Sequence, residues 1–325
     1  MLPPVERRVR RLPVLAAVLA VVGCSLPDVT FDRRDDGGAA GLSGGAGASG
    51  EGGASGAAGM AATGGASGMG GASGTGGASG TGGTAGSAGC GTGDAYRQAV
   101  LADDPVAYWR LDETSGSTAK DSSGNGLDLI IEQGVVVGET GALACDPDLA
   151  MGFANAEAGH LAAGIDPAFE PKNALSFEFW MLQSGPVTPN EKPLWYGDAY
   201  LLPWGAWGFG RVMDESVFDF HVNLAGTSAG VHTDALTLQD TWYYVAATYD
   251  GTTLRVYVDG VLDAQASPPE IPSGPIVYGD DKGIAVGGCY GAGCSTFNGK
   301  IDEVAVYDKV LSAERIAAHF AAGKP

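Results

Sequence analysis

The chain has 325 residues, with 38 acidic and 18 basic side chains and a formal net charge of −20 at pH 7. The first 93 residues contain as many acidic as basic residues, so the whole acidic excess lies after residue 93. This distribution argues against a nucleic-acid or anionic-membrane surface on the C-terminal region, because both require clusters of Lys and Arg. The 54 glycines are unevenly placed and indicate a low-complexity segment together with a β-rich domain.

Residues 1–23 have the layout of an export signal. Four arginines precede an apolar run, Leu12 to Val22, that is too short to span a membrane and is typical of a signal-peptide core. The run ends in "VVGC", which resembles the lipobox of bacterial lipoproteins, where the Cys is acylated and becomes the first residue of the mature chain. We therefore expect an exported protein, lipidated at Cys24, that contacts the outer membrane or cell surface only through its lipid. The alternative is an ordinary secretory signal with an incidental Cys.

Residues 24–93 are expected to form the lipidated N-terminus and a linker. From Gly37 to Gly93 the chain repeats variants of "GGASG" and "GTGG", with no aromatic residue and almost no charge. Such a segment buries too little apolar surface to offset the entropy lost on ordering. We predict a disordered, flexible spacer that precedes one folded domain at residues 94–325.

The folded region reads as a series of short strands. In "WYYVAATY" (242–249) apolar side chains fall on both faces, which is typical of an inner strand covered on both sides. Asp-Gly turns at 250–251 and 259–260 connect it to strands at 254–259 and 261–265. The other predicted strands are 105–113, 127–131, 175–182, 207–213, 216–224, 282–288 and 299–308.

Only residues 312–323 have helical spacing, with Ser312 as the N-cap and Gly323 at the end. Many short strands with one terminal helix predict an all-β domain, an antiparallel sandwich of two sheets.

Four segments carry a family resemblance: "DPVAYWRLDETSGSTAKDSSGNG" (104–126), "LSFEFWM" (175–181), "TWYYVAATYDGTTLRVYVDG" (241–260) and "FNGKIDEVAVYDKVLSAERI" (297–316). In this order they resemble laminin-G-like domains of the concanavalin A-like lectin/glucanase group, over about residues 96–321. The resemblance implies a jelly roll with one concave sheet, which binds a glycan or an envelope or extracellular protein, often with calcium. A glycoside-active enzyme and a structural adhesion or assembly protein are the two alternatives.

Catalytic patterns are weak. The E-x-D-x-x-E strand of the laminarinase-like enzymes does not occur, and the adjacent Asp302 and Glu303 should point to opposite faces of a regular strand. "GTSAG" (226–230) matches G-x-S-x-G around Ser228, but that motif requires a strand-to-helix turn, and here both flanks predict strands or loops. We therefore predict a noncatalytic protein.

Calcium, Ca2+, is the candidate cofactor. "DSSGNGLDLIIE" (121–132) places Asp121, Asn125 and Glu132 at the spacing of ligands in a calcium-binding loop, although the flanking helices of an EF-hand are missing. The alternative is a turn stabilised by the Asp and Asn side chains and leading into the strand at 127–131.

The segment "PLWYGDAYLLPWGAWGFG" (193–210) concentrates aromatic residues. Aromatic rings stack on the apolar faces of sugars, so Trp195, Tyr196, Trp204 and Trp207 are the candidate ligand-binding residues. The alternative is that these rings fill the core, because a domain of this size must bury most of its surface.

Four cysteines remain once Cys24 is assigned to the lipid, and an even number in an exported chain predicts two disulfides. Cys289 and Cys294 flank the short loop "YGAG", so we pair them and, by elimination, pair Cys90 with Cys145. Four cysteines allow three pairings in all.

Overall fold

The computed structural model describes residues 94–143, 148–155, 157–198, 205–211, 217–233, 236, 239–279, 282–291 and 294–324. The predicted signal peptide, Cys24, the linker, the Cys90–Cys145 pair and Trp204 all lie outside the described residues.

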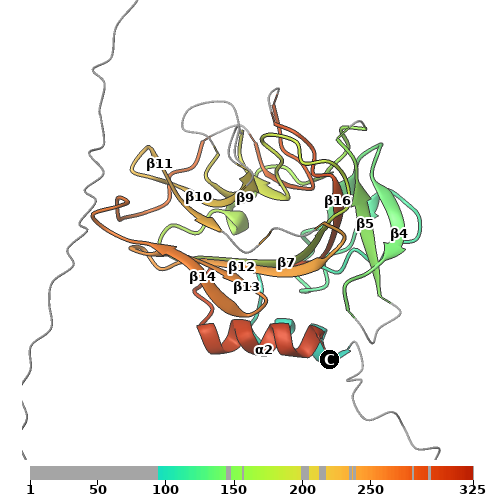
Figure 1. Ribbon diagram of the computed structural model, residues 1–325, viewed down its shortest axis with the longest axis horizontal. Helices are drawn as coiled ribbons and strands as arrows, with labels where there is room; N and C mark the ends of the chain where they lie inside the picture. The colour runs from blue at the N-terminus through green and yellow to red at the C-terminus, as the bar shows by residue number, and fades with distance from the viewer. Residues whose placement is uncertain are drawn as a thin grey trace, which may run out of the picture. The chain divides into compact units, whose positions relative to one another are not determined.

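Two antiparallel sheets stack face to face, and each has eight strands among the described residues (Figure 1). Sheet A runs in the order β14 (Val261–Ala266), β13 (Leu254–Val258), β12 (Trp242–Tyr249), β7 (Leu175–Gln183), β16 (Gly299–Tyr307), β5 (Leu149–Phe153) and β4 (Val136–Thr140), with β1 (Ala107–Trp109) also pairing with β16. Sheet B runs in the order β11 (Thr227–Thr233), β10 (Phe218–Leu224), β9 (Trp207–Arg211), β8 (Leu194–Tyr196), β15 (Ile284–Val286), β6 (Leu161–Ala162), β3 (Leu129–Ile131) and β2 (Thr118–Ala119). The prediction of an all-β sandwich is confirmed.

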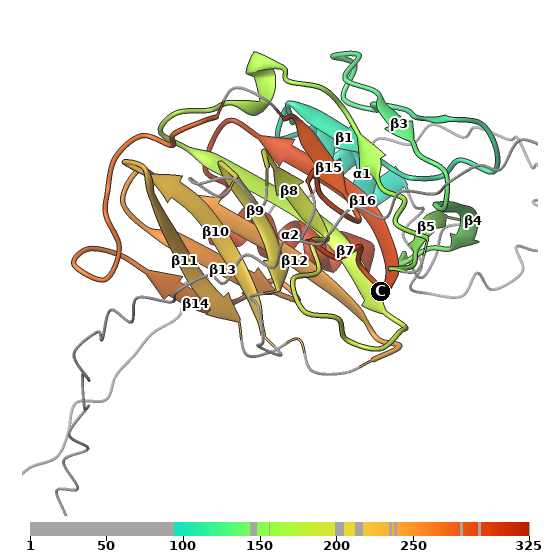
Figure 2. The same ribbon diagram turned by 90° about the horizontal axis from the view of Figure 1, so that it is seen from above.

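The main core lies between the two sheets. In the view from above, β10 and β11 lie over β13 and β14 (Figure 2). Phe177 of β7 reaches across this space to stack on Trp207 of β9, with ring centroids 5.8 Å apart, and meets Phe220 of β10 edge to face at 5.3 Å. These aromatic contacts join the centre of sheet A to the centre of sheet B, because alternate residues of each strand point inward.

Strand β12 is an inner strand of sheet A, as its sequence predicts. It pairs with β7 on one side and β13 on the other. Val245, Ala247 and Tyr249 point into the main core, whereas Tyr244 and Ala246 belong to a second buried cluster on the other face of the sheet. Both faces are therefore covered, which explains why the strand is apolar at nearly every position.

Helix α2 (Ala313–Gly323) lies against the face of sheet A that points away from sheet B (Figure 1). Its N-cap is Ser312, as predicted, and the Ser312 hydroxyl accepts a hydrogen bond from the Arg315 N–H at 3.3 Å.

Helix α1 (Asp94–Leu101) was not predicted, so the expectation of a single helix was wrong. Tyr96 and Val100 lie one turn apart and are fully buried, and the Tyr96 ring meets Trp180 edge to face at 6.2 Å. A helix of eight residues is too short to be stable alone, so packing against sheet A supplies its stability.

The loop after β15 contains the predicted disulfide between Cys289 and Cys294, whose Cα atoms are 6.3 Å apart. A single 3-10 turn, η1 (Pro167–Phe169), begins at Asp166, whose carboxylate accepts from the Ala168 N–H. None of the helices in the described part of the chain has the length and apolar character needed to cross a membrane.

Candidate functional site

The face of sheet B that points away from sheet A, here called the outer face of sheet B, collects polar side chains. On β10 the residues Phe218, Phe220, Val222 and Leu224 are buried in the main core, so the alternating residues point outward. The register of β10 with β11 pairs each of these outward residues with an outward residue of β11. The pairs are Asp219 with His232, His221 with Gly230, and Asn223 with Ser228.

Gly208 of β9 lies between two rings on this face. Its neighbours across the ladder are Trp195 on β8 and His221 on β10. The two rings stack over the glycine, with centroids 5.2 Å apart and planes 21° apart. A Cβ atom at residue 208 would lie 2.5 Å from the Trp195 ring and 2.7 Å from the Leu194 carbonyl oxygen, so only glycine permits this contact.

Two further glycines lie under charged side chains of the same face. A Cβ atom at Gly210 would lie 3.0 Å from Lys192 Nζ, and one at Gly230 would lie 2.8 Å from Asp219 Oδ2. A glycine inside a strand often marks the close approach of another group. The alternation in "WGFGR" (207–211), aromatic residues inward and glycines outward, is a sequence pattern that indicates this floor and that our sequence reasoning missed.

The charged groups of the outer face of sheet B are held in defined places. Lys192 Nζ lies 4.4 Å from the centroid of the Trp195 ring and donates to the Arg211 carbonyl oxygen at 2.9 Å. Burial lowers the pKa of Lys192 to about 8, although the Asp219 carboxylate acts in the opposite direction.

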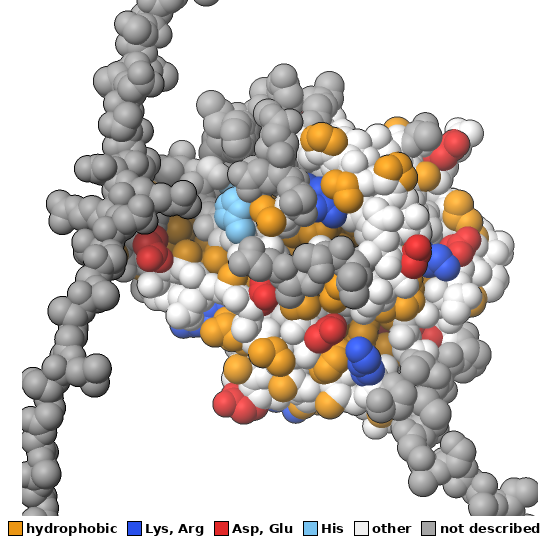
Figure 3. Space-filling model, viewed as in Figure 1, with side chains coloured by type: hydrophobic (Ala, Val, Ile, Leu, Met, Phe, Trp, Pro, Cys, Tyr) orange, Lys and Arg blue, Asp and Glu red, His pale blue; other side chains and the backbone are white. Residues whose placement is uncertain are grey.

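The imidazoles of this face also have partners. The Ser228 hydroxyl lies 2.9 Å from His221 Nδ1, and His232 Nε2 lies 3.9 Å from Asp219 Oδ1. Hydrogen-bond donors and acceptors thus lie side by side on one small surface, together with a cationic group, Lys192, and an anionic group, Asp219. Figure 3 shows an exposed histidine side chain on the side of the molecule where β10 and β11 lie.

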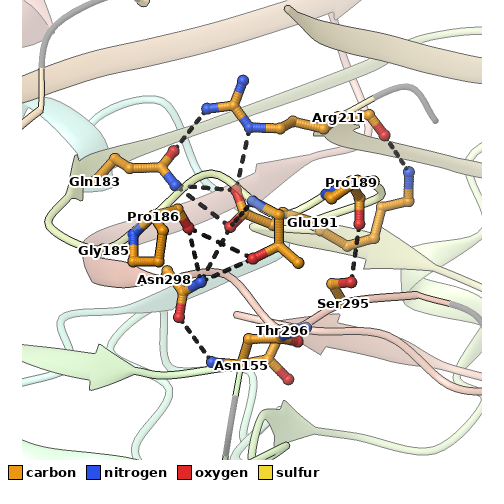
Figure 4. Close-up of polar contacts among 12 residues, drawn as sticks. Asn155, Gln183, Gly185, Pro186, Pro189, Glu191, Arg211, Ser295, Thr296 and Asn298 are labelled. Atoms are coloured by element: carbon orange, nitrogen blue, oxygen red, sulfur yellow. Dashed lines mark hydrogen bonds and ion pairs between the residues drawn. The ribbon is translucent and has the colours of Figure 1, made fainter. Parts of the chain in front are cut away.

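A buried polar network fixes Lys192 at the edge of this face (Figure 4). The fully buried Glu191 carboxylate accepts from Arg211 Nε at 3.1 Å, from Gln183 Nε2 at 3.1 Å and from the Thr188 N–H at 3.0 Å. Arg211 Nη2 in turn donates to Gln183 Oε1 at 2.7 Å. The network joins β7, β9 and the loop before β8. Because it fixes Glu191, the backbone of the next residue, Lys192, has little conformational freedom.

The structure describes three of the four candidate aromatic residues and sends them to different sides of sheet B. Tyr196 and Trp207 stack on each other inside the main core, with centroids 5.6 Å apart. A fully buried ring offers no face to a ligand, so core packing, the alternative stated from the sequence, describes these two residues. Trp195 points to the outer face of sheet B but is only 4% exposed, because Lys192 and His221 lie over its ring.

The candidate calcium loop has other partners. The Asp121 carboxylate accepts from the backbone N–H groups of Tyr108, Ser123 and Leu127 at 2.8–3.0 Å. Asn125 donates to the Val106 carbonyl oxygen at 2.9 Å, and Glu132 pairs with a histidine, His160, at 3.0 Å. These contacts match the alternative, a turn stabilised by its Asp and Asn side chains.

Asp302 and Glu303 both point to the outer face of sheet A, so the expectation that they face opposite sides was wrong. Ile301 and Val304 are both in the main core, and the register of β16 with β7 shifts between Asp302 and Ala305. Glu303 has a positive φ of 53°. Such a bulge adds a residue to one strand and changes where its side chains point, which simple alternation does not foresee.

The bulge brings three buried carboxylates together: oxygen atoms of Asp148, Asp302 and Glu303 lie within 4.8 Å of one another. Arg110 contacts two of them, Glu303 Oε1 at 3.2 Å and Asp148 Oδ1 at 3.1 Å. The hydroxyl of Tyr108 donates to Glu303, and the Ala142 N–H donates to Asp302 Oδ2 at 2.7 Å. Burial, followed by repulsion within the cluster, raises the pKa of Asp302, and burial raises that of Asp148 to about 7.

A second polar cluster lies on the same face, beneath α2. The buried carboxylate of Glu178 accepts from the Tyr307 hydroxyl at 2.8 Å and lies 2.9 Å from His319 Nδ1. The other ring nitrogen of His319 lies 2.9 Å from Asp103 Oδ2. His319 therefore bridges two carboxylates and fastens α2 to β7.

The concanavalin A-like lectin/glucanases superfamily profile of the laminin-G type matches residues 155–317, half of the chain. The chain belongs to this family. Its laminin-G-like domain thus has the fold that the sequence resemblance implied, with the two stacked sheets described above. Among curated protein sequences, no match is found.

Solved structures with the same fold include two toxin domains. The binding domain of Paraclostridial Mosquitocidal Protein 1 is 14% identical, with 68% of this chain and 52% of that chain covered and a TM-score of 0.51. The receptor binding domain of botulinum neurotoxin mosaic serotype C/D is 13% identical, with 68% and 51% covered and the same TM-score. This laminin-G-like chain spans about half the length of each. Domain 4 of an extracellular arabinanase from Geobacillus stearothermophilus, solved with arabinotriose, is 16% identical, with 66% and 98% covered and a TM-score of 0.44.

Proposed function

We propose that this protein is a noncatalytic binding module of the bacterial envelope and that its laminin-G-like domain binds a carbohydrate on the outer face of sheet B. One observation carries the proposal. The side chains of Lys192, Trp195 and Asp219 lie flat over glycines of β9 and β11, namely Gly210, Gly208 and Gly230. Strands β9 and β11 together lack three side chains on one face and so lose packing and β-propensity there, which indicates that the surface serves an arrangement of chemical groups rather than the sheet.

The groups on this face suit a ligand with many hydroxyls. Ser228 and His232 are exposed, and Asp219 is partly exposed, so a donor, an acceptor and an imidazole are within reach of solvent. Sugar hydroxyls donate and accept at once, and they favour surfaces that present both functions side by side. Similarity to the toxin domains concerns the fold alone, so support for a carbohydrate ligand comes from these side chains.

Attachment at the envelope completes the proposal. A lipid on Cys24 and the Gly-rich linker would hold the domain at a membrane while letting it sample a shell of tens of ångströms. Confinement raises the local concentration of binding sites, so that a modest affinity for a surface glycan suffices.

A binding screen tests the proposal. The full-length protein is screened against a glycan array and an envelope extract, and the dissociation constant for the best ligand is measured by calorimetry. Ser228→Ala and His232→Ala should each weaken binding by roughly tenfold, which corresponds to one lost hydrogen bond of about 1.4 kcal/mol. Glu314→Gln on α2, an exposed residue on the other side of the domain, is the matched control and should bind as the wild type does.

The proposal is wrong if no glycan is retained while a single protein is captured from the extract. It is equally wrong if a glycan binds but both variants keep the wild-type affinity, because the ligand then contacts another surface.

A further inference from the structure

We infer that the carbohydrate bound on the outer face of sheet B is an N-acetylated amino sugar. The Trp195 indole N–H donates a hydrogen bond to the carbonyl oxygen of its acetamido group, and the Asn223 side-chain oxygen accepts one from the acetamido N–H. The inference rests on the function proposed above and narrows the ligand class, using hydrogen-bonding atoms that the argument for that function did not use.

Two buried polar atoms carry the inference. Among the described residues, no group forms a hydrogen bond with Trp195 Nε1, which is a donor, or with Asn223 Oδ1, which is an acceptor. Trp195 is 4% exposed and Asn223 is 1% exposed. Buried polar atoms in native proteins almost always have a partner. This part of the chain therefore leaves one donor and one acceptor for a bound group.

Both side chains belong to the surface already proposed for the carbohydrate. Their neighbours along β8 and β10 all lie in the main core: Leu194, Tyr196, Val222 and Leu224. Alternation along each strand therefore points Trp195 and Asn223 to the outer face of sheet B. Asn223 pairs in register with Ser228 of β11, whose exposed hydroxyl group is part of the same surface.

The two side chains meet the chain at adjoining residues. A Cβ atom at Gly205 would lie 2.5 Å from Trp195 Nε1, and the Asn223 N–H donates to the Ala206 carbonyl oxygen at 2.8 Å. The indole extends from β8 over β9, because Gly208 presents no side chain there. Neighbouring strands are about 4.8 Å apart, so an indole lying over β9 brings its N–H within reach of a group that also contacts β10.

The orientation of the Asn223 amide is fixed by a neighbouring segment. Its Nδ2 donates to the Val277 carbonyl oxygen at 3.1 Å, and a flipped amide would bring two acceptor oxygens together. The oxygen is therefore the end of the Asn223 side chain that is left for a ligand, and it requires a donor.

An amide fits this pair of atoms better than a hydroxyl or an amine does. It presents a carbonyl oxygen and an N–H on two separate atoms, which matches a donor and an acceptor that come from different strands. A protonated amine has no acceptor for the Trp195 N–H. Both protein atoms are closed to solvent without the ligand, so neighbouring side chains must shift on binding, as they commonly do at binding surfaces.

Glycans that differ only at carbon 2 of the sugar test the inference. Calorimetry on the full-length protein compares oligosaccharides of N-acetylglucosamine and N-acetylgalactosamine with the parent hexose oligosaccharides and with the deacetylated amines. An acetamido glycan should bind at least about 100-fold more tightly than its hydroxyl counterpart, because each of two buried atoms left unpaired weakens binding about tenfold.

Two substitutions assign the preference to the two atoms. Trp195→Phe removes the N–H but keeps an aromatic ring, and Asn223→Leu removes the acceptor at similar size. Each should reduce the acetamido-over-hydroxyl affinity ratio about tenfold, and thermal unfolding checks that each variant is folded. The ratio separates recognition from a general loss of binding. Trp180→Phe is the matched control, because it makes the same change in a buried ring on sheet A and should keep the wild-type ratio.

The possible failures are distinguishable. If glycans bind but acetamido and hydroxyl counterparts bind equally, the inference is overturned while the proposed carbohydrate function stands. An unchanged affinity ratio in Trp195→Phe or in Asn223→Leu also overturns it, because the acetamido group then contacts other atoms. If no glycan binds at all, the proposed function fails and the inference fails with it.

Discussion

Trp195 and His221 stack across Gly208, with ring centroids 5.2 Å apart on strands β8 and β10. The contact exists because the strand between them presents no side chain on that face. The positions of the side chains on the outer face of sheet B therefore depend on the glycines of β9. Substitution of these glycines tests that dependence directly.

Replacing Gly208 by Ala should lower the free energy of unfolding by about 1–3 kcal/mol, because the added Cβ collides with the Trp195 ring and the Leu194 carbonyl group. Urea denaturation measures the change. Gly164→Ala is the control: its Cβ meets no atom within 4 Å, so its effect should stay within about 0.5 kcal/mol. Equal effects at the two sites would show that Trp195 is not held over residue 208.

Trp207→Ala should destabilise the domain by about 3–5 kcal/mol, because this fully buried ring contacts Phe177 and Tyr196 at the centre of the main core. Val261→Ala on β14 provides the comparison, since Val261 is 69% exposed and should change stability by less than about 0.5 kcal/mol. If Trp207→Ala instead folds with wild-type stability but loses ligand binding, Trp207 is a binding residue and the core assignment is wrong.

Glu191→Ala should cost about 3–5 kcal/mol of stability, because it removes a buried carboxylate that accepts hydrogen bonds from Arg211, Gln183 and the Thr188 N–H. Glu139→Ala removes the carboxylate that pairs with Lys300 at a partly exposed site and should cost about 0–1 kcal/mol. Chemical denaturation of both variants compares the two. A small effect at Glu191 would mean that water reaches the network in Figure 4.

His319 should make stability depend on pH. Burial alone lowers its pKa, but the Glu178 carboxylate and Asp103 more than compensate, so the folded-state pKa lies above the ordinary value of 6.5. The protonated ring therefore stabilises the fold fully below pH 6.5, and this contribution is lost as pH rises through the higher folded-state pKa. Arg315, which lies 3.3 Å from the ring, acts in the opposite sense.

Denaturation of the wild type and of His319→Gln between pH 5 and pH 9 measures this contribution. The difference in unfolding free energy should shrink as pH rises. The buried acids Asp148, Asp302 and Glu303 also bind protons in the folded state, but they are common to both proteins and cancel in the difference. A difference that is constant with pH would show that His319 stays neutral in the fold.

Local patterns were sufficient for much of the fold. Strands β12 to β14 follow from alternation and two Asp-Gly turns, and α2 follows from its N-cap and its spacing. Short elements were not predicted, because β6 has two residues and α1 has eight, which is too few to show a hydrophobic period. Such elements form because neighbouring strands and side chains hold them, and that information is not local.

The candidate sites depended more strongly on long-range contacts. The sequence singled out Trp195, Tyr196 and Trp207 as a group, but the register of β8 with β9 sends Tyr196 and Trp207 into the core and Trp195 to the outer face of sheet B. Alternation along a single strand cannot say which face is covered, because both faces of β8 are buried.

By itself, the amino-acid sequence determined the all-β class and the bond between Cys289 and Cys294, because each depends on composition or on neighbouring residues. Tertiary structure alone decided which side chains meet across strands. Asp302 and Glu303 share one face only because β16 bulges against β7, and Asp148 joins them from the residue just before β5. Register and bulges are settled by the packing of whole sheets, so no window of local sequence contains them.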